Sequence, residues 1–212
     1  MARRPALVLF DLDGVLADYD RGLRCSTLAA ACGASPAAVR EALFGERGLE
    51  PRSDRGEIGL PGYLSRLQAR HGWRIAAPDF LAARRAATSV DARMLALCDR
   101  LEGQAALAIF SNNGSWVERH AADIAPGLAL RFAGRIVCSG SLRRLKPEAA
   151  AYAACLARLG GEPATTVFVD DRQDNVDGAR AAGLDALRFE GAATLRDALI
   201  ARGFDMGADD AI

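Results

Sequence analysis

The sequence predicts an α/β fold: a parallel sheet of about five strands covered by helices, with a helical segment inserted after the first strand. Three observations lead to this prediction. Five short apolar runs show no polar alternation, which is typical of strands buried on both faces. Helical stretches separate the later runs, and this order implies parallel strands joined by right-handed crossovers. The interval between Val15 and Ala105 contains helical patterns but no convincing strand.

The strands of the core are expected at the apolar runs. These runs are residues 6–10, 105–110, 136–138, 165–169 and 186–189. Two core helices are expected over residues 148–159 and 175–182, because each stretch is followed by glycine, which commonly ends a helix.

The helical insertion is expected over residues 17–86, which is too long for one crossover connection. Helical patterns fill it, separated by Gly, Pro and charged residues. They cover residues 23–31, 37–43, 63–70 and 80–87. The predicted organisation is a Rossmann-like core domain formed by residues 1–16 and 87–204, a helical cap domain formed by residues 17–86, and a flexible tail at residues 205–212.

Composition excludes several classes of protein. The 212 residues carry 27 basic and 27 acidic side chains, so the chain lacks the basic excess of a nucleic-acid-binding surface. No apolar run approaches the ~20 residues of a membrane span. The five cysteines are scattered without a C-x-x-C pair, which indicates reduced thiols. Because the first apolar run starts at Ala6, a signal peptide is not expected either. We therefore expect a cytoplasmic protein without nucleic-acid or membrane partners, and its oligomeric state stays open.

Two carboxylates end the first strand, in the segment Phe10-Asp11-Leu12-Asp13-Gly14. Asp11 lies where the strand runs out, at the edge of the sheet where α/β proteins bind ligands. Residues i and i+2 of an extended segment point the same way, so both carboxylates can face one site. Paired acids suit a nucleophile with an acid/base partner, a site for a hard cation, or both. Taken alone, the segment also fits a solvated turn.

Two other expected strands end in polar residues. Ser111 follows residues 105–110, and a hydroxyl followed by backbone N–H groups can hold an anion, although Asn113 or Ser115 could simply cap a helix there. The pair Asp170-Asp171 follows residues 165–169, and adjacent acids repel each other unless a cation lies near them.

A lysine before the next helix is the remaining candidate. Lys146 precedes Pro147, which is favoured in the first turn of a helix, so the lysine is poorly placed for the helix dipole and can serve a neighbouring anion. Arg143 and Arg144 are equally possible on spacing alone. Together these residues predict a Mg²⁺ site made of carboxylates and waters, with Ser111, backbone amides and Lys146 around a phosphoryl group that Asp11 attacks.

The ordered set of these segments resembles the haloacid dehalogenase-like (HAD) superfamily, in the form that carries a helical cap after the first motif. The resemblance covers residues 6–195 and includes Asp11-Leu12-Asp13-Gly14-Val15, Ser111, Lys146-Pro147 and Asp170-Asp171. The stretch from Val167 to Gly183 is also similar to glucose-1-phosphate phosphatases of this family and to the phosphatase domain fused to some epoxide hydrolases. Arg55-Gly56-Glu57-Ile58-Gly59 resembles a recurring cap segment.

The resemblance implies a role for each site residue. Asp11 is the nucleophile and a Mg²⁺ ligand, and Asp13 is the general acid/base and binds Mg²⁺ through its carbonyl. Ser111 and the amide of Asn112 hold the phosphoryl group, which Lys146 steadies together with the nucleophile. The third metal ligand is Asp171. Supporting roles fall to Asp170 and to Asn175, the latter on a metal-bound water.

The expected function is that of a Mg²⁺-dependent phosphatase acting on a small phosphorylated, sugar phosphate-like metabolite through an aspartyl-phosphate intermediate. A phosphomutase on the same machinery is the alternative. A dehalogenase is less favoured because that chemistry lacks the second acid, Asp13, and an inactive metabolite-binding relative is disfavoured by the intact motifs. Substrate specificity is expected in the cap, with Arg52 and Arg55 as candidates.

Overall fold

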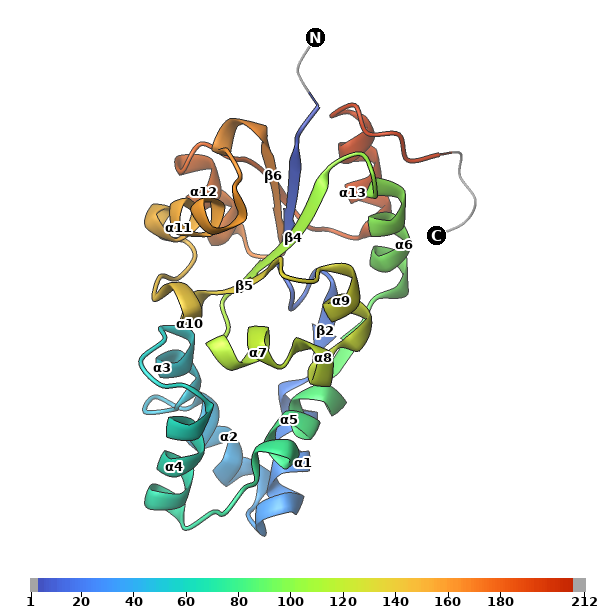
Figure 1. Cartoon of the computed structure of the whole chain (residues 1–212). Helices are drawn as coiled ribbons and strands as arrows, with labels where there is room; N and C mark the ends of the chain where they lie inside the picture. The colour runs from blue at the N-terminus through green and yellow to red at the C-terminus, as the bar shows by residue number, and fades with distance from the viewer. Residues whose placement is uncertain (1–3, 208–212) are drawn as a thin grey trace.

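The computed structural model describes residues 4–207 and contains a five-stranded parallel sheet (Figure 1). Its strands stand in the order β5-β4-β1-β6-β7. Their bounds are β1 (Leu7–Phe10), β4 (Ala106–Ser111), β5 (Ile136–Cys138), β6 (Thr166–Asp170) and β7 (Asp185–Arg188). Every neighbouring pair is parallel, so the predicted α/β fold is confirmed.

The first strand takes the centre of the sheet because both of its faces are apolar. No residue of β1 is more than 3 % exposed. Val8 and Phe10 belong to one hydrophobic core, and Leu7 and Leu9 belong to a second, as the alternation of side chains along a strand requires. Because β1 pairs with β4 on one side and β6 on the other, the carboxyl ends of these three strands meet at one edge.

Helices cover both faces of the sheet. Figure 1 shows α11 (Ala149–Leu159) and α12 (Gln173–Ala181) on one side, and α6 (Ala92–Leu101) and α13 (Ala192–Ile200) on the other. The first pair packs into the core of Leu7 and Leu9, and the second pair packs into the other core. Shorter elements complete the connections: α7 (Ser115–Arg119), α8 (Ala121–Ile124), α9 (Pro126–Arg131), α10 (Ser139–Leu142) and the 3-10 helix η1 (Pro163–Thr165).

Five further helices, which we call the helical segment (residues 21–86), lie beyond the carboxyl edge of the sheet, in the lower part of Figure 1. They are α1 (Arg21–Cys32), α2 (Pro36–Phe44), α3 (Glu50–Asp54), α4 (Leu60–His71) and α5 (Ala77–Ala86). The Asp20 side chain caps α1 by accepting a hydrogen bond from the Leu23 amide. Four of the helices lie at the expected patterns, whereas the five-residue α3 is too short to show a period.

Two strands occur where the sequence predicted none. β2 (Ala17–Tyr19) and β3 (Thr88–Val90) pair antiparallel and connect the helical segment to the sheet domain. Each has three residues, and their pairing joins positions about seventy residues apart, so neither alternation nor a local turn reveals them. The expected boundaries near residues 17 and 86 thus fall beside this two-stranded ribbon.

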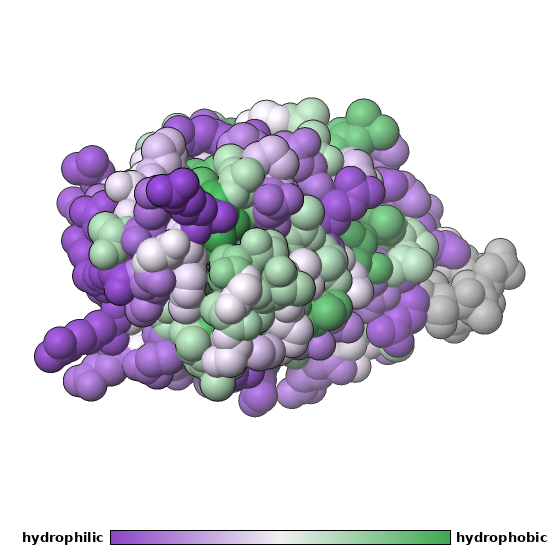
Figure 2. All heavy atoms as spheres, turned by 90° about the horizontal axis from the view of Figure 1, so that it is seen from below, coloured by the Kyte–Doolittle hydropathy of each residue, from purple (hydrophilic) through white to green (hydrophobic). Residues whose placement is uncertain are grey.

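The helical segment has an apolar interior of its own. Tyr63, Leu67 and Phe80 are fully buried within it. Figure 2 views this end of the molecule from below and shows strongly hydrophilic residues around its edge, with paler residues in the middle. Among the described helices, none is both long and apolar enough to cross a lipid bilayer.

The start of the expected tail packs on the sheet domain. Met206 is 1 % exposed, and its carbonyl oxygen accepts a hydrogen bond of 2.5 Å from the Arg100 guanidinium. Gln104 donates to the carbonyl oxygen of Asp205. Residues 205–207 therefore differ from the flexible tail that was predicted, because an apolar side chain and two backbone acceptors attach them to α6 and the turn after it. The remaining positions of that tail, residues 208–212, lie outside the described residues.

Candidate active site

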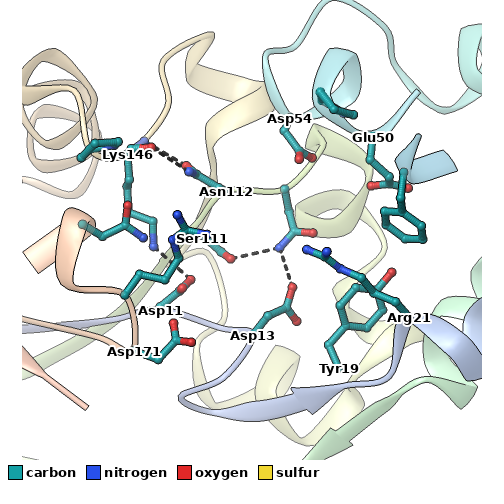
Figure 3. A pocket seen from close by; sticks show the side chains of 16 residues that line it. Asp11, Asp13, Tyr19, Arg21, Glu50, Asp54, Ser111, Asn112, Lys146 and Asp171 are labelled. Carbon is teal, nitrogen blue, oxygen red and sulfur yellow. Dashed lines mark hydrogen bonds and ion pairs between the residues drawn. The ribbon is translucent and has the colours of Figure 1, made fainter. Parts of the chain in front are cut away.

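A cavity of about 520 Å³ opens at the carboxyl ends of the central strands, facing the helical segment (Figure 3). The sheet domain lines it with Asp11, Asp13, Ser111, Asn112, Asn113, Lys146, Pro147, Asp171, Arg172 and Asn175. Strand β2 and the helical segment line it with Tyr19, Arg21, Phe44, Glu50, Pro51 and Asp54. Every residue predicted to take part in catalysis, phosphate binding or metal binding lies in this lining, whereas the supporting residue Asp170 is buried beside Lys146.

The first motif turns sharply after β1. The amide of Asp11 continues the sheet by donating to the carbonyl oxygen of Val169, while its side chain points into the cavity. Gly14 has φ +87°, and a Cβ there would lie 2.7 Å from Oδ2 of Asp171. Glycine is required at this position both by the backbone conformation and by the close approach of that carboxylate. The turn thus brings the first and last motifs together.

Lys146 joins two carboxylates at the base of the cavity. Its buried Nζ lies 3.0 Å from Oδ1 of Asp11 and 2.6 Å from Oδ2 of Asp170, and it donates to the carbonyl oxygen of Phe110 at 2.9 Å. The Asn112 side chain holds the lysine backbone through two hydrogen bonds of 2.9 Å, one accepted from the amide and one donated to the carbonyl. The lysine is therefore fixed at both ends.

The adjacent acids Asp170 and Asp171 have opposite surroundings. Asp170 is fully buried and accepts hydrogen bonds from Lys146, from the Arg172 amide, and from Nδ2 of Asn175 on both oxygens at 3.0 Å. Asp171 is exposed and lines the cavity. Asn175 thus orients Asp170 with its side-chain amide and also lines the cavity, and its contact with a metal-bound water stays a prediction. Asp171 keeps its oxygens available for a ligand.

The carboxylates at this edge fit a divalent cation. Asp11, Asp170 and Asp171 each offer an oxygen within 4.8 Å of the others. Burial raises the pKa of Asp11 to about 7, Lys146 opposes that shift, and the charges of Asp170 and Asp13 add to it. Burial and the neighbouring Asp170 also raise the pKa of Asp171. A hard cation such as Mg²⁺ prefers oxygen ligands of this kind and would relieve the repulsion among them.

Asn113 links the second motif to the first. Its Nδ2 donates to Oγ of Ser111 at 3.0 Å and to Oδ2 of Asp13 at 3.1 Å (Figure 3). Sequence reasoning offered Asn113 only as a helix cap, but the residue at the N-cap of α7 is Gly114 and the side chain of Asn113 faces the cavity. An amide in that position orients both the hydroxyl and the carboxylate.

Asp13 also has an unexpected partner in the helical segment. The Arg84 guanidinium, on α5, donates to both oxygens of Asp13, at 2.6 and 2.8 Å, and lies 3.6 Å from the centre of the Tyr19 ring. Its side chain is 1 % exposed. Burial alone would lower the pKa of Arg84, but the Asp13 carboxylate outweighs it and the pKa is raised. No local pattern marked this arginine, whose partner is 71 positions away.

The wall contributed by α3 carries two carboxyl groups that the sequence did not indicate. Glu50 is buried, forms a 2.7 Å ion pair with Arg24, and accepts a hydrogen bond of 2.8 Å from the Tyr63 hydroxyl. Asp54 also faces the cavity.

The candidates Arg52 and Arg55 are not part of the cavity lining described for this site. Both form 2.9 Å ion pairs with Glu57 at the surface.

Comparison with known proteins identifies the fold and the family. The sequence model of one protein family, the haloacid dehalogenase-like hydrolases, matches residues 5–183 of the chain. No protein with a curated description matches the sequence.

Three solved structures show the same fold. A predicted HAD-like hydrolase from Porphyromonas gingivalis has a TM-score of 0.75 and 21 % identity over 93 % of this chain and 98 % of that one. A HAD-family enzyme from Bacteroides thetaiotaomicron, solved with magnesium and inorganic phosphate, has a TM-score of 0.68 and 20 % identity over 87 % and 93 %. A HAD phosphatase from Thermococcus onnurineus has a TM-score of 0.63 and 20 % identity over 91 % and 97 %.

Proposed function

The chain belongs to the haloacid dehalogenase-like hydrolases, and from this we propose that it is a Mg²⁺-dependent phosphatase that cleaves a small phosphorylated metabolite through an aspartyl-phosphate intermediate. One observation carries the proposal. The Asp11 carboxylate lies at the base of a polar cavity, 3.0 Å from a buried ammonium, with Ser111, Asp13 and Asp171 around the same space. This combination supplies a nucleophile, groups that bind an anion and an acid/base partner within one small volume.

In the first half of the reaction, an oxygen of Asp11 attacks phosphorus and the bond to the leaving alcohol breaks. Asp13 gives its proton to the leaving oxygen. Ser111 and the Asn112 amide hold phosphoryl oxygens, while Lys146 balances the negative charge and fixes the attacking carboxylate. The enzyme then carries a phosphoryl group on Asp11.

In the second half, a water molecule attacks the same phosphorus and the bond to Asp11 breaks, releasing inorganic phosphate. Asp13, now a carboxylate, takes the proton from this water. The two hydrogen bonds from Nη2 of Arg84 and the hydrogen bond from Asn113 support this role because they orient the carboxylate in its ionised form.

Asp11, Asp171 and the main-chain carbonyl of Asp13 would hold Mg²⁺, with water molecules as the other ligands. The ion, when bound, supplies positive charge that screens the phosphoryl oxygens from the attacking carboxylate. The magnesium and phosphate reported for the Bacteroides thetaiotaomicron enzyme agree with this choice.

We propose further that the helical segment acts as a cap that shields the site from water. It contributes one wall of the cavity, and β2 and β3 form the two connections about which it could move.

A phosphomutase must also bind a second phosphate group. The carboxyl groups of Glu50 and Asp54 on the cap wall would repel that phosphate, so they disfavour a phosphomutase. Free cysteines among the described residues fit a cytoplasmic enzyme.

The test is hydrolysis of p-nitrophenyl phosphate with Mg²⁺ by the wild type and by Asp11→Asn. The amide is a poor nucleophile, so we expect a loss of at least about 10³-fold in kcat with an unchanged circular dichroism spectrum. Glu57→Gln, on the surface away from the cavity, is the control and should keep its activity. Near-normal turnover by Asp11→Asn would contradict the covalent mechanism.

A further inference from the structure

One positive charge in the wall of the cavity has no carboxylate partner. Arg21, the first residue of α1, lines the cavity and, within residues 4–207, forms no ion pair or hydrogen bond. Figure 3 shows its guanidinium pointing into the cavity from the side of the helical segment. A guanidinium carries a permanent charge and several N–H donors, so an unpaired one that faces a ligand cavity indicates an anionic group on the ligand.

The other basic side chains of the cavity already have partners. Lys146 is paired with two carboxylates at the base of the cavity, and Arg172 forms a 3.3 Å ion pair with Asp174. Among the described basic residues of the lining, Arg21 is therefore the one whose charge is left for a group that arrives with the substrate.

Two acids that share the lining with Arg21 are paired with other cations. Asp13 accepts two hydrogen bonds from Arg84, and Glu50 forms its 2.7 Å ion pair with Arg24. These carboxylates are thus engaged by buried arginines, and neither of them pairs with Arg21.

The ring of Phe44 restrains the Arg21 side chain. Cζ of Arg21 lies 5.2 Å from the centre of this ring, within the range of a cation–π contact. Phe44 is the last residue of α2 and lines the same cavity. The contact gives the N–H groups of the guanidinium no oxygen acceptor, so Arg21 is held near the cavity with its hydrogen-bonding capacity unused.

The position of Arg21 indicates which part of the substrate it meets. Figure 3 shows Arg21 on the far side of Asp13 from Asp11. In the proposed reaction Asp11 attacks phosphorus and Asp13 protonates the leaving oxygen, so the space beyond Asp13 belongs to the leaving alcohol. Arg21, Asp13 and Tyr19 also line an adjoining hollow of about 470 Å³, which extends this space.

A carboxylate fits this position better than a second phosphate does. It carries one negative charge, which one guanidinium balances, and its two oxygens match the N–H groups of the guanidinium. A second phosphate carries about 1.5 to 2 negative charges at pH 7 and would face the carboxyl groups of Glu50 and Asp54 in the same wall.

We propose that Arg21 binds a carboxylate on the leaving alcohol, so that the preferred substrates are phosphate monoesters of hydroxy acids. This inference rests on the proposed phosphatase function and names a substrate class that differs from the sugar phosphate expected from the sequence. It assigns substrate selection to Arg21 in the cavity rather than to Arg52 and Arg55 at the surface.

The experiment compares 3-phosphoglycerate with glycerol 1-phosphate, which has a hydroxymethyl group in place of the carboxylate. For the wild type with Mg²⁺ we expect kcat/KM to favour 3-phosphoglycerate by about 10- to 100-fold, the value of a hydrogen bond to a charged group. In Arg21→Gln the preference should fall to about 3-fold or less, chiefly through a higher KM, because the carboxylate is bound alike in the ground state and the transition state. Arg21→Lys keeps the charge without the planar group and should keep part of the preference.

Arg40→Gln is the matched control. It removes the same charge from the neighbouring helix α2, where Arg40 is exposed and is not among the residues that line the cavity. Its preference should equal that of the wild type. A loss in Arg40→Gln as large as that in Arg21→Gln would overturn the inference, because the effect would then come from the net charge of the helical segment.

Three further results would overturn the inference. They are a wild type that cleaves 3-phosphoglycerate no better than glycerol 1-phosphate, an undiminished preference in Arg21→Gln, and a higher kcat/KM for glycerol 1,3-bisphosphate than for 3-phosphoglycerate. The last result would assign Arg21 to a second phosphate.

Activity on p-nitrophenyl phosphate separates this failure from failure of the proposed function. If the wild type hydrolyses that ester and Asp11→Asn does not, the phosphatase function stands and only the carboxylate preference is refuted. If the wild type hydrolyses none of the esters, the proposed function itself fails.

Discussion

Asp13 shows how one residue can depend on a contact from a distant part of the chain. Both oxygens of its carboxylate accept hydrogen bonds from one nitrogen, Nη2, of Arg84, which is buried against the ring of Tyr19. The planar guanidinium stacks on that ring, which an ammonium group on a flexible stem does not do, and the stacking fixes the nitrogen that faces Asp13. We therefore regard Arg84 as a positioning residue for the carboxylate to which we assign the acid/base role.

Arg84→Lys keeps the positive charge and removes the planar group that stacks on Tyr19. We expect kcat/KM to fall by about 10-fold or more on alkyl phosphates, which need a proton on the leaving oxygen, and by much less on p-nitrophenyl phosphate, whose leaving group does not. The comparison of the two esters is the measurement. Arg85→Lys, one position along and exposed, is the control. An equal loss on both esters would argue for a structural role instead.

The site residues that could be predicted are those whose position is fixed by nearby sequence. Asp11, Ser111 and Asp171 were predicted because each comes directly after a buried strand, and parallel strands place their carboxyl ends at one edge. Spacing alone did not distinguish Lys146 from Arg143 and Arg144 as the residue that contacts an anion. Burial distinguishes them, since only the lysine is enclosed.

Arg84 and Asp54 could not be found in this way. Their position at the site depends on how the helical segment packs on the sheet. The residues next to them in the sequence form no pattern that predicts this packing. Asn113 was visible as a polar residue after a strand, but a cap and a site residue look alike until the backbone of α7 is known.

At the scale of elements, the strands buried on both faces were predicted well and the short surface elements were not. The runs at 136–138 and 165–169 match β5 and β6 within one residue, because an uninterrupted apolar run has few alternatives. β2, β3 and α3 have three to five residues each. Their formation depends on pairing with, or packing on, chain far away in the sequence, which periodicity does not report.

The docking of α3 on the sheet domain depends on backbone contact. A Cβ on Gly140 would lie 2.6 Å from the backbone nitrogen of Ser115 and 2.7 Å from the carbonyl oxygen of Ser53. Both neighbours are main-chain atoms, so neither can move aside as a side chain would. Gly140 thus permits α3, and Asp54 at its end, to lie close to the site.

Gly140→Ala should push α3 away from the sheet domain. We expect a destabilisation of about 1–3 kcal/mol and a fall in kcat/KM of about 10- to 100-fold, together with faster amide hydrogen exchange in α3. In Gly127→Ala the added Cβ meets nothing within 4 Å, so this variant serves as the control. If Gly140→Ala leaves exchange in α3 at the wild-type rate, close docking through this glycine is not required.

At the scale of the whole molecule, several carboxylates lie close together where the sheet domain and the helical segment meet. The negative charges of Asp11, Asp170 and Asp171 face the positive charge of one buried lysine, Lys146. Burial acts to lower the pKa of Lys146, but Asp11 and Asp170 outweigh it, so this pKa is raised. In the absence of a cation this arrangement opposes folding at neutral pH. The global stability should therefore respond both to pH and to Mg²⁺.

The sign follows from Asp11, whose pKa rises from 3.8 to about 7 in the folded protein. The folded state binds the Asp11 proton more tightly than the unfolded state does. Protonation of Asp11 therefore stabilises the folded protein fully below pH 3.8, and this contribution is lost as the pH rises through about 7. Asp11→Asn lacks this titration. Without Mg²⁺, the wild type should lose about 4 kcal/mol relative to Asp11→Asn across that interval, or about 8–16 °C in Tm.

Added Mg²⁺ should reverse this difference. At 100 times its Kd the ion contributes about 2.7 kcal/mol to the wild type, and it contributes much less to Asp11→Asn, which lacks one anionic ligand. Thermal melts of both proteins, with chelator and with Mg²⁺ at pH values below 4 and above 8, measure the effect. Ca²⁺, which favours more ligands in a looser geometry, should restore little activity. A Tm difference that stays constant with pH and is insensitive to Mg²⁺ would show that Asp11 is neither raised in pKa nor a ligand of the ion.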